Sequence, residues 1–148
     1  MTRKREKRLR AQIDARDAEP GRIPTAPRLP DELVVVSYRH YDPGGQYCLS
    51  NCTRDEIREY KDCVRMLTQL TWNQVLLQSG KGQHKAGLAY TPYRDSDLKG
   101  ASRPATVSPQ LQISAVRGSQ KMRLFGVRQG TVYYILWYDR THSIVPDS

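Results

Sequence analysis

Apolar and polar residues alternate along the last third of the chain, where the pattern predicts three strands. The first covers residues 111–115 and the second covers residues 122–127. After a tight turn at Gln129-Gly130, residues 131–138 are dense in β-branched and aromatic side chains, which is typical of a third strand. Arginine, lysine and tyrosine are interleaved with the apolar positions. The pattern therefore predicts an antiparallel sheet with a cationic and aromatic face.

Helical periodicity marks the middle of the chain. The segment Thr53-Arg54-Asp55-Glu56 has the S/T-x-x-E pattern of a capping box and an acidic first turn. Apolar residues then follow three or four positions apart, at Ile57, Tyr60, Val64, Leu67 and Leu70. The segment 71–74 repeats the capping pattern and opens a second, shorter helix that Ser79-Gly80 should end. Two consecutive helices, a helical hairpin, are therefore expected between strands.

Further strands are expected on either side of these helices. Residues 33–38 read as a strand, Asp42-Pro43-Gly44-Gly45 as a turn and residues 46–49 as a returning strand. From Gly80 to about residue 108 the pattern predicts mostly loop, with a short strand at 88–90. The expected fold is a single α+β domain over residues 33–148, with a small antiparallel sheet packed against the helical hairpin.

The register of the last hairpin stays open at this stage. A two-residue loop at Gln129-Gly130 places Lys121 and Arg123 on the same face as Tyr134 and Tyr138. A three-residue turn with a bulge at Gly130 would flip the partner strand. Along 121–125 the alternation itself is firm, with the odd-numbered residues on one face and the even-numbered residues on the other.

Charge changes the picture from a plain sheet to a candidate binding surface. The chain has 24 Lys and Arg against 15 Asp and Glu, a formal charge of +9. An acidic polymer, nucleic acid first, is the expected partner of so basic a protein. Residues 1–19 form a basic arm, disordered or marginally helical, that either binds nucleic acid or serves as a solubilising tail. Its first ten residues hold six cations, namely Arg3, Lys4, Arg5, Lys7, Arg8 and Arg10.

Several protein classes are excluded or disfavoured by the remaining composition. Residues 20–32 hold four prolines and are expected to be a linker, with a proline-groove ligand as the alternative. No apolar run approaches the ~20 residues of a membrane span, and no secretory signal is present, so a cytoplasmic protein is expected. Three cysteines in such a chain predict reduced thiols. With His40 they match no common zinc spacing, so no metal or other cofactor is expected.

The segment LQISAVRG…KMRLFGVRQGTVYYILWYDRTH, together with the preceding helices, resembles the RelE/ParE toxin superfamily. Members carry a strand with L-x-x-S, then Y/M-R-L/I-x-F/G, a tight turn, and a strand ending in a cationic or histidine tail. The similarity covers roughly residues 53–145. It implies a RelE-like fold and a toxin of a toxin–antitoxin or phage-defence type system. Many members cleave mRNA on the ribosome without a metal, and a cognate antitoxin silences them.

The resemblance also implies roles for particular residues. Arg117 and Arg123 match family positions that bind phosphate on the central strands, and His142 matches a terminal region where some members carry a catalytic His or Tyr. Lys121, on the same face as Arg123, joins them as a catalytic candidate. The segment containing Lys81, His84 and Lys85 resembles the cationic stretch after the second helix, which implies roles in orienting RNA or in proton transfer. The other candidate nucleic-acid contacts are Arg128, Arg140 and Tyr134.

RNA cleavage through its own 2′-hydroxyl requires a base, an acid and cations for the phosphate, and these residue types supply all three. The sequence departs from the family where paired lysines are replaced by Tyr138-Asp139-Arg140-Thr141-His142. Two other functions therefore remain open. One is a non-catalytic nucleic-acid-binding or interaction protein that uses the same sheet, and the other is a toxin of this fold that acts on a protein such as a topoisomerase.

Overall fold

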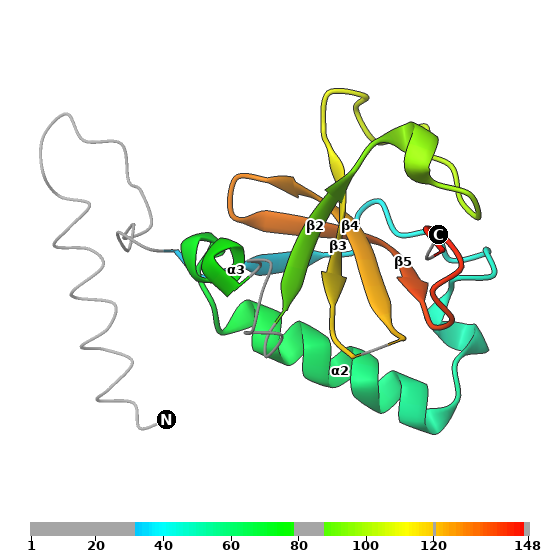
Figure 1. Ribbon diagram of the computed structural model, residues 1–148, viewed down its shortest axis with the longest axis horizontal. Coiled ribbons are helices and arrows are strands. Elements are labelled where there is room, and N and C mark those ends of the chain that lie inside the picture. Colours follow the sequence, from blue (N-terminus) through cyan, green and yellow to red (C-terminus); the bar gives the residue numbers. More distant parts are fainter. Residues whose placement is uncertain (1–31, 79–87, 120, 147–148) are drawn as a thin grey trace, which may run out of the picture. The chain divides into compact units, whose positions relative to one another are not determined.

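The computed structural model describes residues 32–78, 88–119 and 121–146, which belong to one unit of the chain (Figure 1). The basic arm, the proline-rich linker and the candidates Lys81, His84 and Lys85 lie outside the described residues. Within the described part of the chain, no helix is long and apolar enough to cross a membrane.

The core of the unit is a five-stranded mixed sheet with the order β1-β5-β4-β3-β2. The strands are β1 (Val35–Ser37), β2 (Ala89–Tyr93), β3 (Ile113–Arg117), β4 (Arg123–Gln129) and β5 (Val132–Asp139). Strands β2 to β5 pair antiparallel, whereas β1 runs parallel to β5. The α+β class is confirmed. The prediction of a wholly antiparallel sheet is wrong because of β1.

Two α-helices, α2 (Arg54–Thr68) and α3 (Trp72–Gln78), form where the sequence predicts them. The Thr53 N–H donates to Glu56 Oε1 at 2.8 Å, and the Glu56 N–H donates to Thr53 Oγ1 at 3.3 Å. Thr71 and Gln74 exchange the same two bonds at the start of α3, at 3.0 and 3.2 Å. Each pair satisfies backbone donors that a helix start leaves open, so the local sequence sets both starting points.

Both faces of the sheet are covered, one by helix α2 and the other by irregular segments. On one face, Tyr60, Cys63 and Leu67 of α2 pack against sheet residues such as Leu124 and Val116. The other face, called the outer face below, is covered by irregular segments that contribute Tyr47, Val107 and Ile144. The central strands β3 and β4 are consequently mostly buried on both sides, and β5 is almost entirely buried. In the central strands β3 and β4 the charged side chains lie at the strand ends, whereas the edge strand β2 also exposes Thr91 in its middle.

The predicted hairpin between residues 33–38 and 46–49 is wrong. Residues 46–48 form a turn that leads into a short 3₁₀ helix, η1 (Leu49–Asn51), and no returning strand forms there. Instead the segment 33–47 follows the free edge of β5. Beyond β1, the Asp42 N–H donates to the Leu136 carbonyl at 3.4 Å, and the Tyr138 N–H donates to the Tyr47 carbonyl at 3.1 Å. Covering an otherwise open sheet edge outweighs the local turn signal.

The last hairpin turns one residue later than predicted and contains a bulge. Gln129 pairs with Val132, so the loop is Gly130-Thr131, and Gly130 takes the positive φ of 62°. Further along, Phe125 pairs with Trp137 while Gly126 pairs with Ile135, which leaves Leu136 as an extra residue in β5. Beyond Leu136, the bulge reverses which face of the sheet the odd-numbered and even-numbered side chains of β5 occupy. Neither turn considered from the sequence anticipated it.

The bulge decides which side chains lie with Arg123. Tyr134, which pairs with Val127, is half-buried on the outer face together with Phe125. Tyr138 pairs with Leu124 and is buried on the helix face. Arg123 is two residues before Phe125 in β4, so it belongs to the outer face with Tyr134 and not with Tyr138. The odd and even alternation predicted along β4 is confirmed.

Candidate functional site

Two arginines meet at one end of the sheet. Arg117, the last residue of β3, and Arg123, the first of β4, are direct cross-strand partners, and both are half-buried. Arg117 Nε donates to the Ser119 carbonyl at 3.2 Å, and Arg123 Nη1 donates to the same oxygen at 3.1 Å. One carbonyl therefore holds both guanidinium groups together. We call Arg117 and Arg123 the arginine pair.

The turn that joins these strands is seated firmly against α2. A Cβ at Gly118 would lie 2.9 Å from Cys63 Cβ, so only glycine lets the backbone approach the helix this closely. The Ser119 hydroxyl accepts a hydrogen bond from the Met122 N–H at 3.2 Å, and Met122 is buried in the helix-side core. These contacts fix the turn, and with it the Ser119 carbonyl that holds the arginine pair.

The strand β5, which also ends at this end of the sheet, carries a buried carboxylate. Asp139 is the cross-strand partner of Arg123 and is 0% exposed. Its Oδ1 accepts from Ser143 N at 3.1 Å, from Ser143 Oγ at 3.3 Å and from Thr141 N at 3.4 Å. Its Oδ2 accepts from Ile144 N at 2.8 Å. The carboxylate thus organises the segment 140–144 that follows β5.

His142 lies within the segment that Asp139 organises. It is half-buried, and it is the one residue other than glycine in the described part of the chain with a positive φ, 57°. A side chain with a Cβ costs of the order of 1 kcal/mol in this conformation. The register places this segment at the same end of the sheet as the arginine pair, because β5 ends beside the start of β4.

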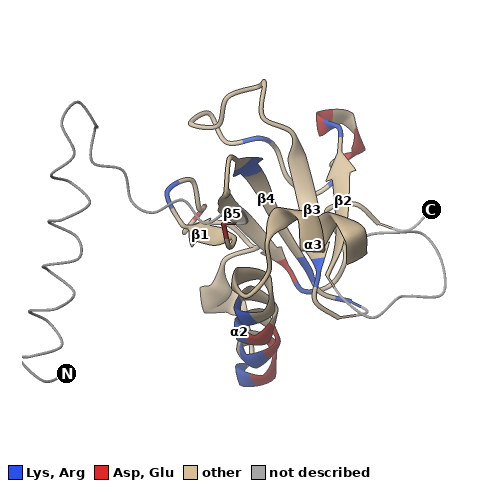
Figure 2. Ribbon diagram, turned by 90° about the vertical axis from the view of Figure 1, so that its left-hand side faces the viewer, with Lys and Arg blue, Asp and Glu red and all other residues tan. Residues whose placement is uncertain are grey.

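Positive charge is concentrated in the arginine pair, whereas charge on α2 is mixed. Figure 2 shows basic and acidic residues side by side along α2, where Arg58 lies 4.0 Å from Asp55 and Lys61 lies 3.8 Å from Asp62. In the arginine pair two like charges occupy opposed positions of adjacent strands, and Asp139 occupies the position opposite Arg123 on β5. Each guanidinium has five N–H donors, and in the described residues the two Nη groups of Arg117 have no bonding partner. An oxyanion can bind there.

Lys121 and Arg140 both lie near this end of the sheet, but Lys121 is exposed whereas Arg140 is bonded to other residues. Lys121 is exposed in the turn between β3 and β4, beside Arg123. Arg140 Nη1 instead donates to the Asn51 carbonyl and lies 3.2 Å from Glu56 Oε1. The backbone N–H of Thr53, with a smaller contribution from Arg140, holds the pKa of Glu56 below its usual range. Arg140 therefore ties the end of β5 to the start of α2.

Arg128 and Tyr134 are not part of the same cluster. Arg128 lies five residues along β4 from Arg123, about 17 Å at ~3.3 Å per residue. Its guanidinium carbon is 4.5 Å from the centre of the Trp72 ring, a cation–π contact. Tyr134 packs against His40, with ring centres 5.0 Å apart. Neither side chain can contact a phosphate held by the arginine pair.

The cysteines and His40 do not converge. His40 Nδ1 is 3.1 Å from Thr106 Oγ1 on the outer face, whereas Cys63 is buried on the helix face. In the described ranges, no group of three or more His, Cys, Asp or Glu side chains is placed to hold a metal ion. Burial raises the pKa of Cys63 to about 12. Hydroxyl donors from Ser50 and Tyr41 lower the pKa of Cys48.

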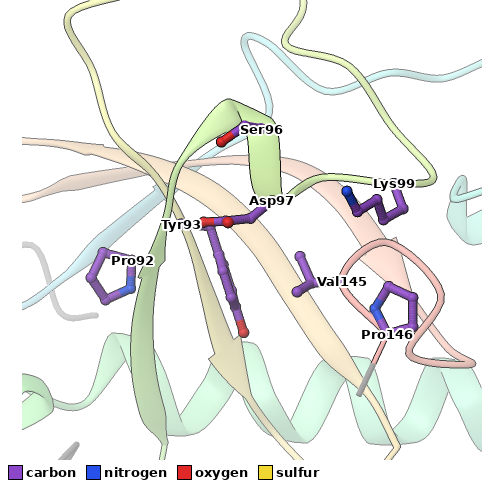
Figure 3. A pocket seen from close by; sticks show the side chains of 7 residues that line it. All are labelled: Pro92, Tyr93, Ser96, Asp97, Lys99, Val145 and Pro146. Atoms are coloured by element: carbon purple, nitrogen blue, oxygen red, sulfur yellow. The ribbon is translucent and has the colours of Figure 1, made fainter. Parts of the chain in front are cut away.

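Sequence reasoning missed a second feature, an open pocket of about 670 Å³ on the outer face (Figure 3). It is lined by Pro92, Tyr93, Ser96, Asp97, Lys99, Val145 and Pro146. These residues come from the end of β2, from the short 3₁₀ helix η2 (Asp95–Asp97) with the bend at Lys99 that follows it, and from the C-terminal segment. The first two stretches read as loop, and nothing in their pattern links them to residues 145 and 146.

No protein-family model, curated protein or solved structure matches this chain. The resemblance to the RelE/ParE superfamily stays a prediction. Function is therefore inferred from the chemistry of the arginine pair, the segment that Asp139 organises and the outer-face pocket.

Proposed function

We propose that this protein is a toxin-like endoribonuclease that cleaves mRNA without a metal ion, in the manner implied by its resemblance to the RelE/ParE superfamily. The observation that carries the proposal is the arginine pair, which holds two guanidinium groups on one carbonyl at an end of the sheet. The +9 formal charge of the chain supports a polyanionic partner.

The arginine pair supplies the phosphate site. A scissile phosphate that lies against Arg117 and Arg123 can accept hydrogen bonds from both guanidinium groups. Planar guanidinium donors match phosphate oxygens well and keep their charge at any physiological pH. Because the pair is half-buried, its donors are preorganised and partly shielded from water. Such donors stabilise the extra negative charge that the phosphate gains in the transition state.

In the proposed reaction, the 2′-oxygen attacks the adjacent phosphorus and the bond from phosphorus to the 5′-oxygen breaks. The products are a 2′,3′-cyclic phosphate and a free 5′-hydroxyl. A base takes the proton of the 2′-hydroxyl, and an acid returns a proton to the departing 5′-oxygen. His142 fills one of these roles, because an imidazole exchanges protons near neutral pH. Exposed Lys121 is the second candidate for charge neutralisation or proton transfer.

Although Asp139 lies opposite Arg123, its carboxylate is not a free negative charge at the phosphate site. Its carboxylate accepts four hydrogen bonds from the segment 141–144, all within the protein. In the proposed enzyme it is a positioning residue, which holds the chain around His142 in one conformation. Ribosome-bound mRNA and a cognate antitoxin are the partners that the same resemblance implies.

The decisive experiment compares induced expression of the wild type with three variants in a bacterial host, following growth and mapping new 5′ ends in mRNA. Arg117→Ala combined with Arg123→Ala removes the phosphate site, and His142→Asn removes the imidazole while tolerating a positive φ. Arg58→Ala is the matched control, since it removes an exposed cation from α2.

The proposal expects growth arrest and new mRNA ends for the wild type and for the control. It expects both to be lost in the arginine variant, and cleavage to fall about 100-fold or more in His142→Asn. Circular dichroism and urea unfolding must show that each variant is folded. Intact mRNA with soluble, folded wild type, or equal cleavage by the arginine variant, refutes the nuclease. RNA binding without cleavage would instead indicate the non-catalytic reading.

A further inference from the structure

The outer-face pocket lies on the same side of the sheet as the arginine pair. Tyr93 pairs with Ile113, and four residues along the same strands Ala89 pairs with Arg117. The distance along β3 is about 13 Å at ~3.3 Å per residue. A few nucleotides of extended single strand cover such a distance. The C-terminal segment links the two places, because Val145 and Pro146 follow closely after His142.

The pocket is suited to a flat, partly polar ring. Pro92, Tyr93, Val145 and Pro146 provide its apolar surface. The Tyr93 ring is itself held in a stacked arrangement on Phe125, 5.9 Å between centres and 28° between planes. Figure 3 shows Tyr93 and Asp97 on one side of the pocket, with Val145 and Pro146 on the other. Because the pocket is open to solvent, a ring that belongs to a polymer can enter and leave it.

Asp97 gives the pocket a fixed pair of acceptors. Its Oδ2 accepts from the Arg94 N–H at 2.8 Å, which closes the turn of η2 and fixes the carboxylate. Its Oδ1 faces only a loose ion pair, 3.6 Å from Arg94 Nη2, and the Arg94 side chain is 81% exposed. A carboxylate offers about four acceptor positions, so at least two remain for a ligand. Lys99 adds an exposed cation at the rim.

We infer that this pocket binds a guanine base of the RNA strand whose phosphate lies at the arginine pair, an inference that rests on the proposed function. Guanine presents two adjacent N–H donors, N1–H and the N2 amino group, which match the two oxygens of one carboxylate. On their Watson–Crick edges, adenine, cytosine and uracil each place a hydrogen-bond acceptor next to the donor. They would therefore leave one Asp97 oxygen facing an acceptor. The apolar lining packs on the faces of the ring, and Lys99 neutralises a flanking phosphate.

The test measures binding, separately from cleavage. Fluorescein-labelled hexamers of 2′-O-methyl RNA cannot be cut through a 2′-hydroxyl, and their affinities for the full-length protein are read by fluorescence anisotropy. One hexamer is all uridine, and the others carry guanine or adenine at each position in turn. The variants are Asp97→Asn, which keeps an acceptor for the Arg94 N–H, and Asp62→Asn, a control on α2 that changes the charge equally.

Guanine at one position should tighten binding about tenfold over uridine and adenine, the value of one charge-assisted hydrogen-bonded contact. Asp97→Asn should abolish that preference without weakening all-uridine binding, and Asp62→Asn should keep it. The inference is overturned if all hexamers bind equally, or if the preference survives Asp97→Asn. Either result leaves the nuclease proposal intact, because the mapping of mRNA ends with the Arg117→Ala, Arg123→Ala variant tests that proposal separately. Absence of RNA binding altogether overturns both.

Discussion

Replacement of Asp139 by asparagine tests whether a buried carboxylate organises the segment around His142. The substitution hardly changes the shape of the side chain, yet it replaces one carboxylate oxygen by an amide donor. Oδ1 accepts three hydrogen bonds and Oδ2 accepts one, so the amide oxygen will take the Oδ1 position. The amide NH₂ then faces the buried Ile144 N–H, donor against donor.

The expected loss of stability follows from these contacts. An unsatisfied buried N–H costs about 1–3 kcal/mol, and the three remaining bonds weaken because their acceptor is no longer charged. Together these effects predict a loss of about 3–5 kcal/mol, a large part of the ~5–15 kcal/mol typical of a domain. At a urea m-value of about 1.5 kcal/mol per M, the unfolding midpoint should fall by about 2–3 M.

Urea unfolding followed by tryptophan fluorescence measures this shift, with Asp42→Asn as the control. Asp42 Oδ1 accepts one bond, from the Gly44 N–H at 3.2 Å in an exposed turn, and asparagine can make the same bond. The control should stay within about 0.5 kcal/mol of the wild type. If Asp139→Asn also stays within about 1 kcal/mol with an unchanged m-value, the carboxylate does not hold the segment as described.

Three further predictions concern the framework of the fold. Gly126→Ala should destabilise by about 3 kcal/mol or more in urea unfolding, because the new Cβ would lie 2.5 Å from the Tyr134 carbonyl and 2.7 Å from the Tyr133 ring; a loss under 1 kcal/mol would contradict this packing. Folding lowers the pKa of Glu56, so its carboxylate stabilises the fold above the unfolded-state pKa and loses that effect as the pH falls through the folded-state pKa. The Glu56→Gln variant should therefore be up to about 1 kcal/mol less stable than the wild type at pH 7. Unfolding measured across pH should show this difference vanish toward pH 3. Burial raises the pKa of Cys63 to about 12, so at pH 8 iodoacetamide should alkylate this thiol last in mass-spectrometric mapping, and early labelling would show that the helix-side core opens.

Local signals explain which parts of the fold could be predicted from the sequence. Both helices start at reciprocal side-chain caps, and those caps depend on residues three positions apart. The shifted turn has a local reason as well. A positive φ suits Gly130 and not Gln129, so Gln129 stays in β4 and the loop begins one residue later.

The parts that could not be predicted depend on contacts between distant residues. Nothing in residues 33–49 indicates that β5, and not a returning strand, is the partner of β1. The bulge at Leu136 lies inside an unbroken run of β-branched and aromatic residues, which carries no mark of an extra residue. For the same reason the sequence could not indicate that Arg140 bonds to Glu56, a residue far away in the chain.

The candidate site shows the same division. Arg117 and Arg123 were predicted to bind phosphate, and the structure brings them together because the strands are joined by a short turn. Arg128 and Tyr134 were grouped with them on residue type alone, and distance along the sheet separates them. The outer-face pocket is assembled from segments that only the folded outer face brings into contact. Residue chemistry could be read from the sequence, whereas proximity required the fold.

The parallel pairing of β1 with β5 constrains the order in which this protein can fold during synthesis. Val35 pairs with Val132, so the first strand of the sheet waits for the last one to leave the ribosome. Until then α2 and α3 can form from local signals, and the hairpin of β3 and β4 can close over a short turn. The strand β1, however, has no partner to pair with. Closing so long a loop is slow and leaves apolar surface exposed meanwhile. The nascent chain is therefore most dependent on chaperones just before the last strand is complete.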